Sequence, residues 1–106
     1  MSISNNSEGR KNDSEKTVRP ELIPPELIEA TGTILAFGAK KYADRNWEKG
    51  MNWSRVFGAL MRHLWAWWKK EESDPETGYS HLWHAACCLS FLIAYEQRTI
   101  GTDDRP

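Results

Sequence analysis

Apolar residues recur at three- and four-residue intervals in three stretches of the 106-residue chain, which is the spacing of one face of an α-helix. The first stretch follows a proline pair at 24–25, and it predicts a helix over about 25–42 because proline is tolerated in the first turn. The second predicts a helix over about 54–72, with Ser54 as its N-cap. Its end is predicted from Pro75, which disfavours helical geometry in the residue before it.

The third stretch predicts a helix over about 80–98, capped by Ser80. No segment shows period-two alternation, so we expect an all-α fold: a small helical bundle with three principal helices. The first residues contain few large apolar groups and predict a flexible polar arm over 1–20, ahead of a single domain over 21–100. The segment 101–106 is predicted to be a polar, frayed tail.

The connection between the second and third helices, 73–79, is short, which predicts that these helices are antiparallel neighbours. A domain of roughly 80 residues buries a limited core, and self-association is a common remedy at this size. Trp65, Trp68 and Trp83 are therefore expected in the core or in an oligomer interface. We expect a homo-oligomer.

The overall charge gives no sign of a polyanionic partner. With a formal net charge of −1, neither a nucleic-acid polymer nor an anionic membrane is expected as a partner. The N-terminus lacks the apolar run of a signal peptide, and the longest apolar-leaning run, 85–95, is far short of the roughly 20 residues of a membrane span. We expect a soluble, cytoplasmic protein. The adjacent Cys87 and Cys88 cannot easily bridge each other, which agrees with a reducing compartment.

The chemistry is expected in the segment EESDPETGYSHLWH, residues 71–84. Signatures of phosphate-binding loops, dinucleotide-binding folds, zinc peptidases and serine hydrolases are absent from the sequence. His81 and His84 are three residues apart, so both rings project from one face of the third helix, where His63 could meet them. Carboxylates and imidazoles bind divalent cations, and a mixed set favours transition metals. The candidate metal ligands are Glu71, Asp74, Glu76, His81 and His84.

A metal site competes with a simpler interpretation of this segment. Acidic residues after a helix are commonly solvated, and two histidines at helical spacing are often a packing or surface accident. One observation favours the cation: Glu71 and Glu72 fall at the predicted end of the second helix, where the helix dipole is unfavourable to negative charge. Helix stability therefore does not explain these two residues, whereas a bound cation does.

A basic and aromatic loop is a second candidate surface. Trp47 stands near Lys41 and Arg45, and a ring beside cations suits the base and phosphates of a nucleotide. The alternative is a loop tryptophan that fills the edge of the core. The N-terminal arm carries further cations, either in a solvated tail or in an arm that closes over bound phosphate. These cations are Lys11, Lys16 and Arg19.

Three segments resemble a family of small phage-borne domains described as dATP/dGTP diphosphohydrolase, related to the MazG-like all-α nucleotide pyrophosphohydrolases. The segments are GRKNDSEKTVRPELIPPE (9–26), FGAKKYADRNWEKG (37–50) and RHLWAWWKKEESDPETGYSHLWHAACCLSFL (62–92). The resemblance implies metal-dependent hydrolysis of a purine deoxynucleoside triphosphate, dATP or dGTP, to the monophosphate and pyrophosphate, which adjusts a nucleotide pool. It also implies Mg²⁺ or Mn²⁺ as cofactor and the cytoplasm of a host cell as location.

The resemblance assigns roles by position. Glu71, Glu76 and His63 are the implied catalytic residues, beside the metal ligands named above. The implied phosphate, base and sugar contacts are Lys11, Lys16, Arg19, Lys41, Tyr42, Arg45, Asn46, Trp47 and Arg62. The better-known MazG-like enzymes hold Mg²⁺ with two acidic pairs, and here His81 and His84 stand in place of the second pair.

Two other functions fit the sequence. A non-catalytic binding protein of phage origin would sequester a nucleotide, or a host defence signalling nucleotide, without cutting it. An oligomeric scaffold would use its tryptophans as an interface and bind no ligand. Site-specific binding separates the first two functions from the scaffold, because a ligand that binds only the folded state raises its thermal stability.

Overall fold

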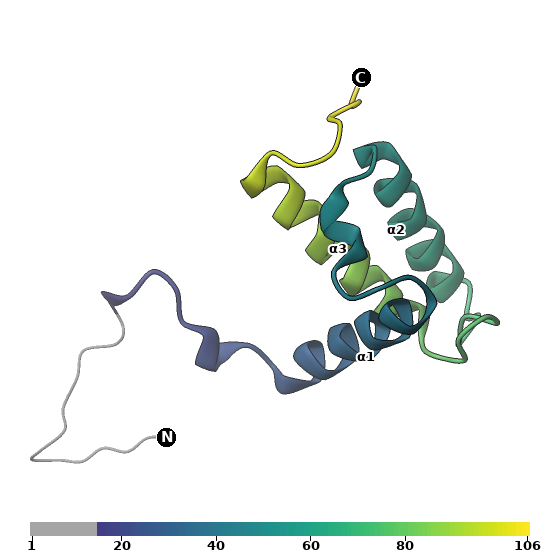
Figure 1. Ribbon diagram of the computed structural model, residues 1–106. Helices are drawn as coiled ribbons and strands as arrows, with labels where there is room; N and C mark the ends of the chain where they lie inside the picture. Colours follow the sequence, from purple (N-terminus) through teal and green to yellow (C-terminus); the bar gives the residue numbers. More distant parts are fainter. Residues whose placement is uncertain (1–14) are drawn as a thin grey trace, which may run out of the picture.

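Three α-helices form the body of the protein, which a computed structural model describes over residues 15–106 (Figure 1). They are α1 (Pro25–Lys41), α2 (Trp53–Trp68) and α3 (His81–Arg98); the short 3₁₀ helices η2 (Pro20–Leu22) and η3 (Asn46–Lys49) precede α1 and α2. Beyond two isolated backbone bridges, the described residues contain no β-structure. The predicted all-α class is therefore confirmed, with three principal helices close to the expected ranges.

The central element is α3, which packs against both other helices. It runs antiparallel to α2, as the short connection between them predicts, and α1 crosses it on another side (Figure 1). The α3 N-cap is also as predicted, because Ser80 accepts a hydrogen bond of 3.1 Å from the backbone N–H of Leu82. The buried core is small and draws on all three helices. Its apolar members are Ala30, Ile34, Val56, Ala85, Cys87 and Tyr95.

The end of α2 differs from its predicted position. The helix ends at Trp68, not near Glu72, because Lys70 adopts a left-handed conformation with φ of 72°. The backbone N–H of Lys70 donates to the carbonyl of Trp67, and that of Glu71 donates to the carbonyl of Ala66. These two bonds form a Schellman motif, which usually has glycine at the left-handed position. With lysine there, the sequence carried no stop signal ahead of Pro75.

The start of α2 depends on the C-terminal tail. Ser54 is not the N-cap, because the helix begins at Trp53 and the cap residue Asn52 makes no side-chain capping bond. The capping acceptor is Asp104, whose carboxylate accepts hydrogen bonds from both the backbone N–H and the hydroxyl of Ser54. These bonds hold the pKa of Asp104 below its ordinary value. The tail is thus packed on α2, in place of the frayed end that its composition predicts.

Two glycines allow the tail to pass close to the segment before α2. Gly50 and Gly101 have φ values of 94° and 79°, in the region that favours glycine. A Cβ atom on Gly101 would collide with the backbone carbonyl oxygen of Met51, and one on Gly50 would lie 2.8 Å from the backbone nitrogen of Gly101. The crossing holds the connection from α1 to α2 in one position.

The same connection is anchored on α3 through Trp47. The hydroxyl of Tyr95, which is fully buried, donates a hydrogen bond of 2.6 Å to the backbone carbonyl of Trp47. The Trp47 ring stacks on Phe91 with 4.7 Å between ring centroids. None of the helices in the described part of the chain is long and apolar enough to cross a membrane.

Candidate functional site

The three histidines of the chain converge where α2 meets the start of α3. The Nδ1 atoms of His63 and His81 are 2.9 Å apart. The ring of His63 also stacks on that of His84, with 4.6 Å between centroids and an interplanar angle of 11°. His63 therefore faces the two histidines of α3, as the predicted helical faces require.

Asp74 completes this group from the turn between the two helices. Its Oδ2 lies 4.0 Å from Nδ1 of His63. Its other oxygen, Oδ1, accepts hydrogen bonds from the backbone N–H groups of Glu76, at 2.8 Å, and Thr77, at 3.2 Å. One ligand atom each from His63, Asp74 and His81 lies within 4.8 Å of the others. We call these three residues the His–Asp cluster.

Glu71 contacts His81 on the side of its ring that faces away from the cluster. Its carboxylate is 2.8 Å from Nε2 of His81, the ring nitrogen that faces away from the cluster. Although α2 ends at Trp68, Glu71 still lies at the C-terminus of that helix, because its backbone N–H donates to the carbonyl of Ala66. Its carboxylate contacts His81, the first residue of α3, where a helix dipole favours negative charge. Its position therefore has an explanation that requires no cation.

The geometry of the His–Asp cluster fits a divalent ion. Neighbouring ligand atoms at about 2.1 Å from an ion are themselves separated by about 3 Å, close to the distance between the two Nδ1 atoms. In His81 and Asp74, the polar atom that does not face the cluster already has a hydrogen-bond partner. Nε2 of His81 pairs with Glu71, and Oδ1 of Asp74 accepts from two backbone N–H groups. Outer hydrogen bonds of this kind orient metal ligands. Two imidazoles and one carboxylate favour Mn²⁺ or another transition metal over Mg²⁺.

The remaining predicted ligands, Glu76 and His84, turn towards a neighbouring cavity. Glu76 accepts a hydrogen bond of 2.7 Å from Nζ of Lys41, and this bond raises the pKa of Lys41. Nε2 of His84 is 2.7 Å from the hydroxyl oxygen of Thr77. The five predicted ligands are thus divided: Asp74 and His81 belong to the cluster, Glu71 stands behind it, and the other two line the cavity.

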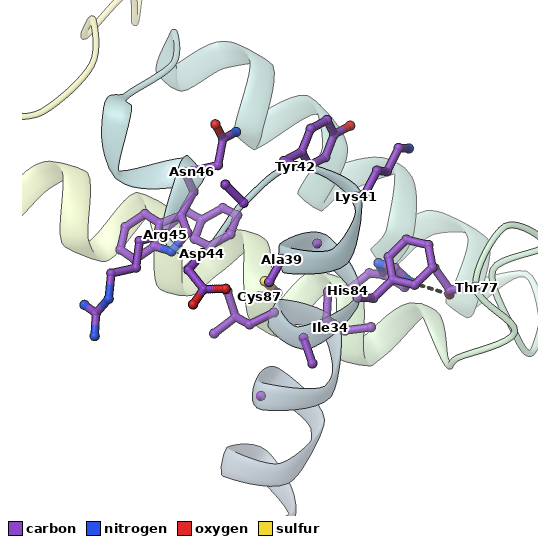
Figure 2. Close-up of a pocket in the computed structure, with 18 of the residues that line it drawn as sticks. Ile34, Ala39, Lys41, Tyr42, Asp44, Arg45, Asn46, Thr77, His84 and Cys87 are labelled. Atoms are coloured by element: carbon purple, nitrogen blue, oxygen red, sulfur yellow. Dashed lines mark hydrogen bonds between the residues drawn. The ribbon is translucent and has the colours of Figure 1, made fainter.

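The cavity has a volume of 840 Å³ and lies between the C-terminal half of α1, the connection to η3, and α3. Figure 2 shows Thr77 and His84 at one end, Asp44 and Arg45 at the other, and the last turns of α1 between them. The floor is apolar and includes Ile34 and Cys87. Because His63 stacks on His84, the His–Asp cluster lies one imidazole ring behind the cavity wall.

Five of the predicted substrate-binding residues line this cavity: Lys41, Tyr42, Arg45, Asn46 and Trp47. Arg45 has a left-handed backbone, with φ of 58°, and its side chain is 79% exposed. Among residues 15–106 its ion pair is a distant one, at 3.8 Å, to Glu48. It is therefore available to a ligand. Trp47 fills the edge of the core through Phe91, which is the alternative considered from the sequence, although part of it still borders the cavity.

The other predicted phosphate contacts lie elsewhere. Arg19 pairs with Glu21 at 3.0 Å, and neither Arg19 nor Lys16 lines the cavity. Arg62 is also absent from its lining, with its guanidinium group close to Gly58 on α2. Lys11 is outside the residues that the structure describes. Arg19 and Lys16 precede α1, on the segment that extends away from the three-helix body (Figure 1).

Sequence reasoning missed three polar residues of the cavity: Asp44, Arg55 and Thr77. Asp44 is next to the predicted residue Arg45, and Thr77 lies within the acidic segment 71–84. Proximity in sequence to predicted site residues could therefore have indicated both. No sequence pattern indicated Arg55, because it reaches the cavity from the first turn of α2. The thiol of Cys87 faces the same space, but burial raises its pKa to about 12, so it is not a nucleophile at neutral pH.

Burial keeps two of the histidines neutral. Desolvation lowers the pKa values of His63 and His84 from 6.5, and for His63 the nearby His84 adds to the effect. The unfolded chain takes up these protons near pH 6.5, whereas the folded chain takes them up only at lower pH. The contribution of these two histidines to the free energy of unfolding is therefore fully present above pH 6.5. It is lost as the pH falls through their lowered pKa values.

We expect the melting temperature, measured by circular dichroism in EDTA, to fall as the pH is reduced below 6.5. A variant with His63→Gln and His84→Gln should show a flatter dependence over this range, because it lacks both titrating groups. Equal slopes for the two proteins would contradict the assignment.

Comparison with known proteins bears on this arrangement. A family described as "dATP/dGTP diphosphohydrolase, N-terminal" matches residues 6–105 of the chain. The chain belongs to this family. The resemblance seen in the three sequence segments is thereby confirmed, and the His–Asp cluster and the cavity both fall within the matched span.

One relative of the dATP/dGTP diphosphohydrolase family comes from Salmonella phage PMBT28 and is itself named dATP/dGTP diphosphohydrolase. It is 36% identical over 84 residues, which cover 79% of this chain. The chain spans 29% of the length of that relative. No solved structure matches the chain.

Proposed function

We propose that this chain is a metal-dependent hydrolytic domain that converts dATP or dGTP to the monophosphate and pyrophosphate. The observation that carries the proposal is the His–Asp cluster, one imidazole ring from a cavity that presents cations and aromatic rings. Family membership and the name of the phage relative support the same substrate class.

The cavity suits a nucleotide in size and chemistry. Its volume of 840 Å³ falls in the range of small-molecule sites, and its lining is mostly apolar with a few polar groups. Arg45, Arg55 and Lys41 would bind the phosphates, because guanidinium and ammonium groups complement phosphate charge. Tyr42 and Asn46 would contact the base or sugar, with the free edge of Trp47 beside them.

His63, Asp74 and His81 would hold the metal ion, with Glu71 keeping the ring of His81 in position. With the His84 ring turned aside, the ion, Mn²⁺ or Mg²⁺, would neutralise the triphosphate charge and lower the pKa of an attacking water. Neutral imidazoles suit this role because metal binding requires unprotonated nitrogen. In metal-free protein, His81 can donate through Nε2 to Glu71, and His63 can donate through Nδ1 to His81. Metal binding then requires that His63 carry its proton on Nε2.

The reaction breaks the bond between the α-phosphorus and the oxygen that bridges to the β-phosphate. A water oxygen forms the new bond to the α-phosphorus, and pyrophosphate leaves with the electron pair. We assign the water proton to Glu76, whose carboxylate faces the cavity beside Thr77. When Lys41 turns from Glu76 to a phosphate, the carboxylate is freed to accept that proton.

The test is a product assay on the purified chain. Each deoxynucleoside triphosphate is incubated with Mn²⁺ or Mg²⁺, and the nucleotides and pyrophosphate are separated by anion exchange. We expect equal amounts of monophosphate and pyrophosphate from dATP and dGTP, with more from Mn²⁺ than from Mg²⁺, and none in EDTA. Tight binding of a nucleotide that is recovered intact under every condition would overturn hydrolysis in favour of the sequestering function.

A further inference from the structure

The ring of His84 lies between the His–Asp cluster and the cavity. It stacks on His63 with 4.6 Å between ring centroids, and His84 itself lines the cavity, whereas His63, Asp74 and His81 do not. A phosphate group in the cavity therefore reaches the metal-binding nitrogen of His63 only after the His84 ring has moved. The groups that hold this ring in place control that step.

One hydrogen bond holds the His84 ring in its position against His63. Nε2 of His84 is 2.7 Å from the hydroxyl oxygen of Thr77, as the dashed line in Figure 2 shows. The same oxygen accepts a hydrogen bond of 3.2 Å from the backbone N–H of Tyr79, so the hydroxyl is itself held. Because a hydroxyl can both donate and accept, it can bond either tautomer of the imidazole. We call this contact the Thr77–His84 bond.

The His–Asp cluster does not depend on the Thr77–His84 bond. Thr77 contacts Asp74 through its backbone N–H, at 3.2 Å, and not through its hydroxyl. Nε2 of His81 is held separately, by a carboxylate at 2.8 Å. The His84 side chain can therefore adopt another rotamer while Asp74 and His81 keep their hydrogen bonds.

A second side-chain bond ties the same turn to α1. Glu76, which precedes Thr77, accepts a hydrogen bond of 2.7 Å from Nζ of Lys41, and all three residues line the cavity. In the proposed reaction Lys41 turns from Glu76 to a phosphate. A bound triphosphate thus removes the restraint from α1 on the residue next to Thr77, which favours the state in which the Thr77–His84 bond is broken.

We propose that Thr77 is a positioning residue, whose hydroxyl keeps the His84 ring over the cluster until a triphosphate enters the cavity and the ring turns aside. The inference rests on the proposed function and names the step that admits the phosphates to the metal ion. Only chains with the ring turned aside bind the phosphates at the ion, so the apparent affinity for nucleotide is reduced by the fraction of such chains. Removing the Thr77 hydroxyl should therefore tighten nucleotide binding.

The test compares Thr77→Val, which removes the hydroxyl with little change of shape, with Thr77→Ser, which keeps it. With Mn²⁺, Thr77→Val should lower the KM for dATP or dGTP about fivefold, the factor that one hydrogen bond is typically worth, and leave kcat within about twofold of the parent. Thr77→Ser should retain the parent KM. The matched control is Thr33→Val, because Thr33 donates to the backbone carbonyl of Glu29 on α1 and does not line the cavity.

A second measurement requires no turnover. Diethyl pyrocarbonate acylates accessible neutral imidazoles, and peptide mass spectrometry identifies the modified residue. In EDTA, we expect His63 to be modified about fivefold faster in Thr77→Val than in the parent, because the ring that covers it turns aside more often. Thr77→Ser and Thr33→Val should show the parent rate. In a His84→Ala background, which lacks the covering ring, Thr77→Val should cause no further increase.

Equal His63 modification rates in Thr77→Val and the parent would overturn the proposal, whatever the turnover. A raised KM would do the same, since a Thr77 that only supports the turn would displace Asp74 when its hydroxyl is lost. An effect of Thr77→Val on His63 that persists without the His84 ring would also overturn it. A parent chain without turnover would overturn the proposed hydrolysis, while the His63 rates would still decide the role of Thr77.

Discussion

An Asp74→Asn variant is expected to release pyrophosphate from dATP or dGTP at least about 100-fold more slowly than the parent chain, because it loses the one anionic ligand of the His–Asp cluster. The substitution is suited to the geometry. Asparagine keeps an oxygen that can accept the backbone N–H groups of Glu76 and Thr77, so the turn retains its bonds while the carboxylate charge is lost. The variant should also bind Mn²⁺ more weakly, as measured by electron paramagnetic resonance.

The matched control is Glu72→Gln, which removes an acid from the same segment. Glu72 is exposed and makes no hydrogen bond or ion pair within the described residues. This variant should keep both its turnover and its affinity for Mn²⁺. If Asp74→Asn folds normally and retains turnover within about threefold of the parent, the His–Asp cluster is not the metal centre of the reaction.

A Tyr95→Ala variant is expected to lower the free energy of unfolding by about 3–5 kcal/mol, which is a large part of the stability of a domain this small. Tyr95 has 0% exposure, and its ring lies at the base of the contact between α3 and the connection that carries η3. Removing it leaves a cavity and takes away one of the two hydrogen bonds to the backbone carbonyl of Trp47, which also accepts from the backbone N–H of Gly50. Urea denaturation followed by circular dichroism measures the change.

Two further substitutions separate the contributions. Tyr95→Phe retains the ring and removes only the hydrogen bond to Trp47, so it should cost about 1 kcal/mol. Tyr42→Ala removes a tyrosine that is 65% exposed and should change stability by no more than about 0.5 kcal/mol. A loss for Tyr42→Ala equal to that for Tyr95→Ala would contradict the assignment of Tyr95 as the principal core residue.

Local patterns in the chain were enough to predict the helices. Helical periodicity depends on neighbours three and four residues apart, so the extents of α1 and α3 followed from the order of residues alone. The cap of α3 did as well, because Ser80 bonds a backbone group only two residues away. The contact between His63 and the α3 histidines could also be predicted, because a short turn between two helices leaves few ways to pack them.

Contacts between distant parts of the chain determined the rest. The acceptor that caps α2 is Asp104, 50 residues from Ser54, and no local pattern indicates it. The end of α2 was predicted near Glu72 and lies at Trp68, because it depends on a left-handed lysine that has no sequence signal. The division of the acidic and histidine residues between the cluster and the cavity depends on side-chain bonds such as that from Lys41 to Glu76, which form only once α1 is docked. Residue types and spacing therefore indicated the candidate side chains, while the packing of α1 on α3 determined which of them lie together.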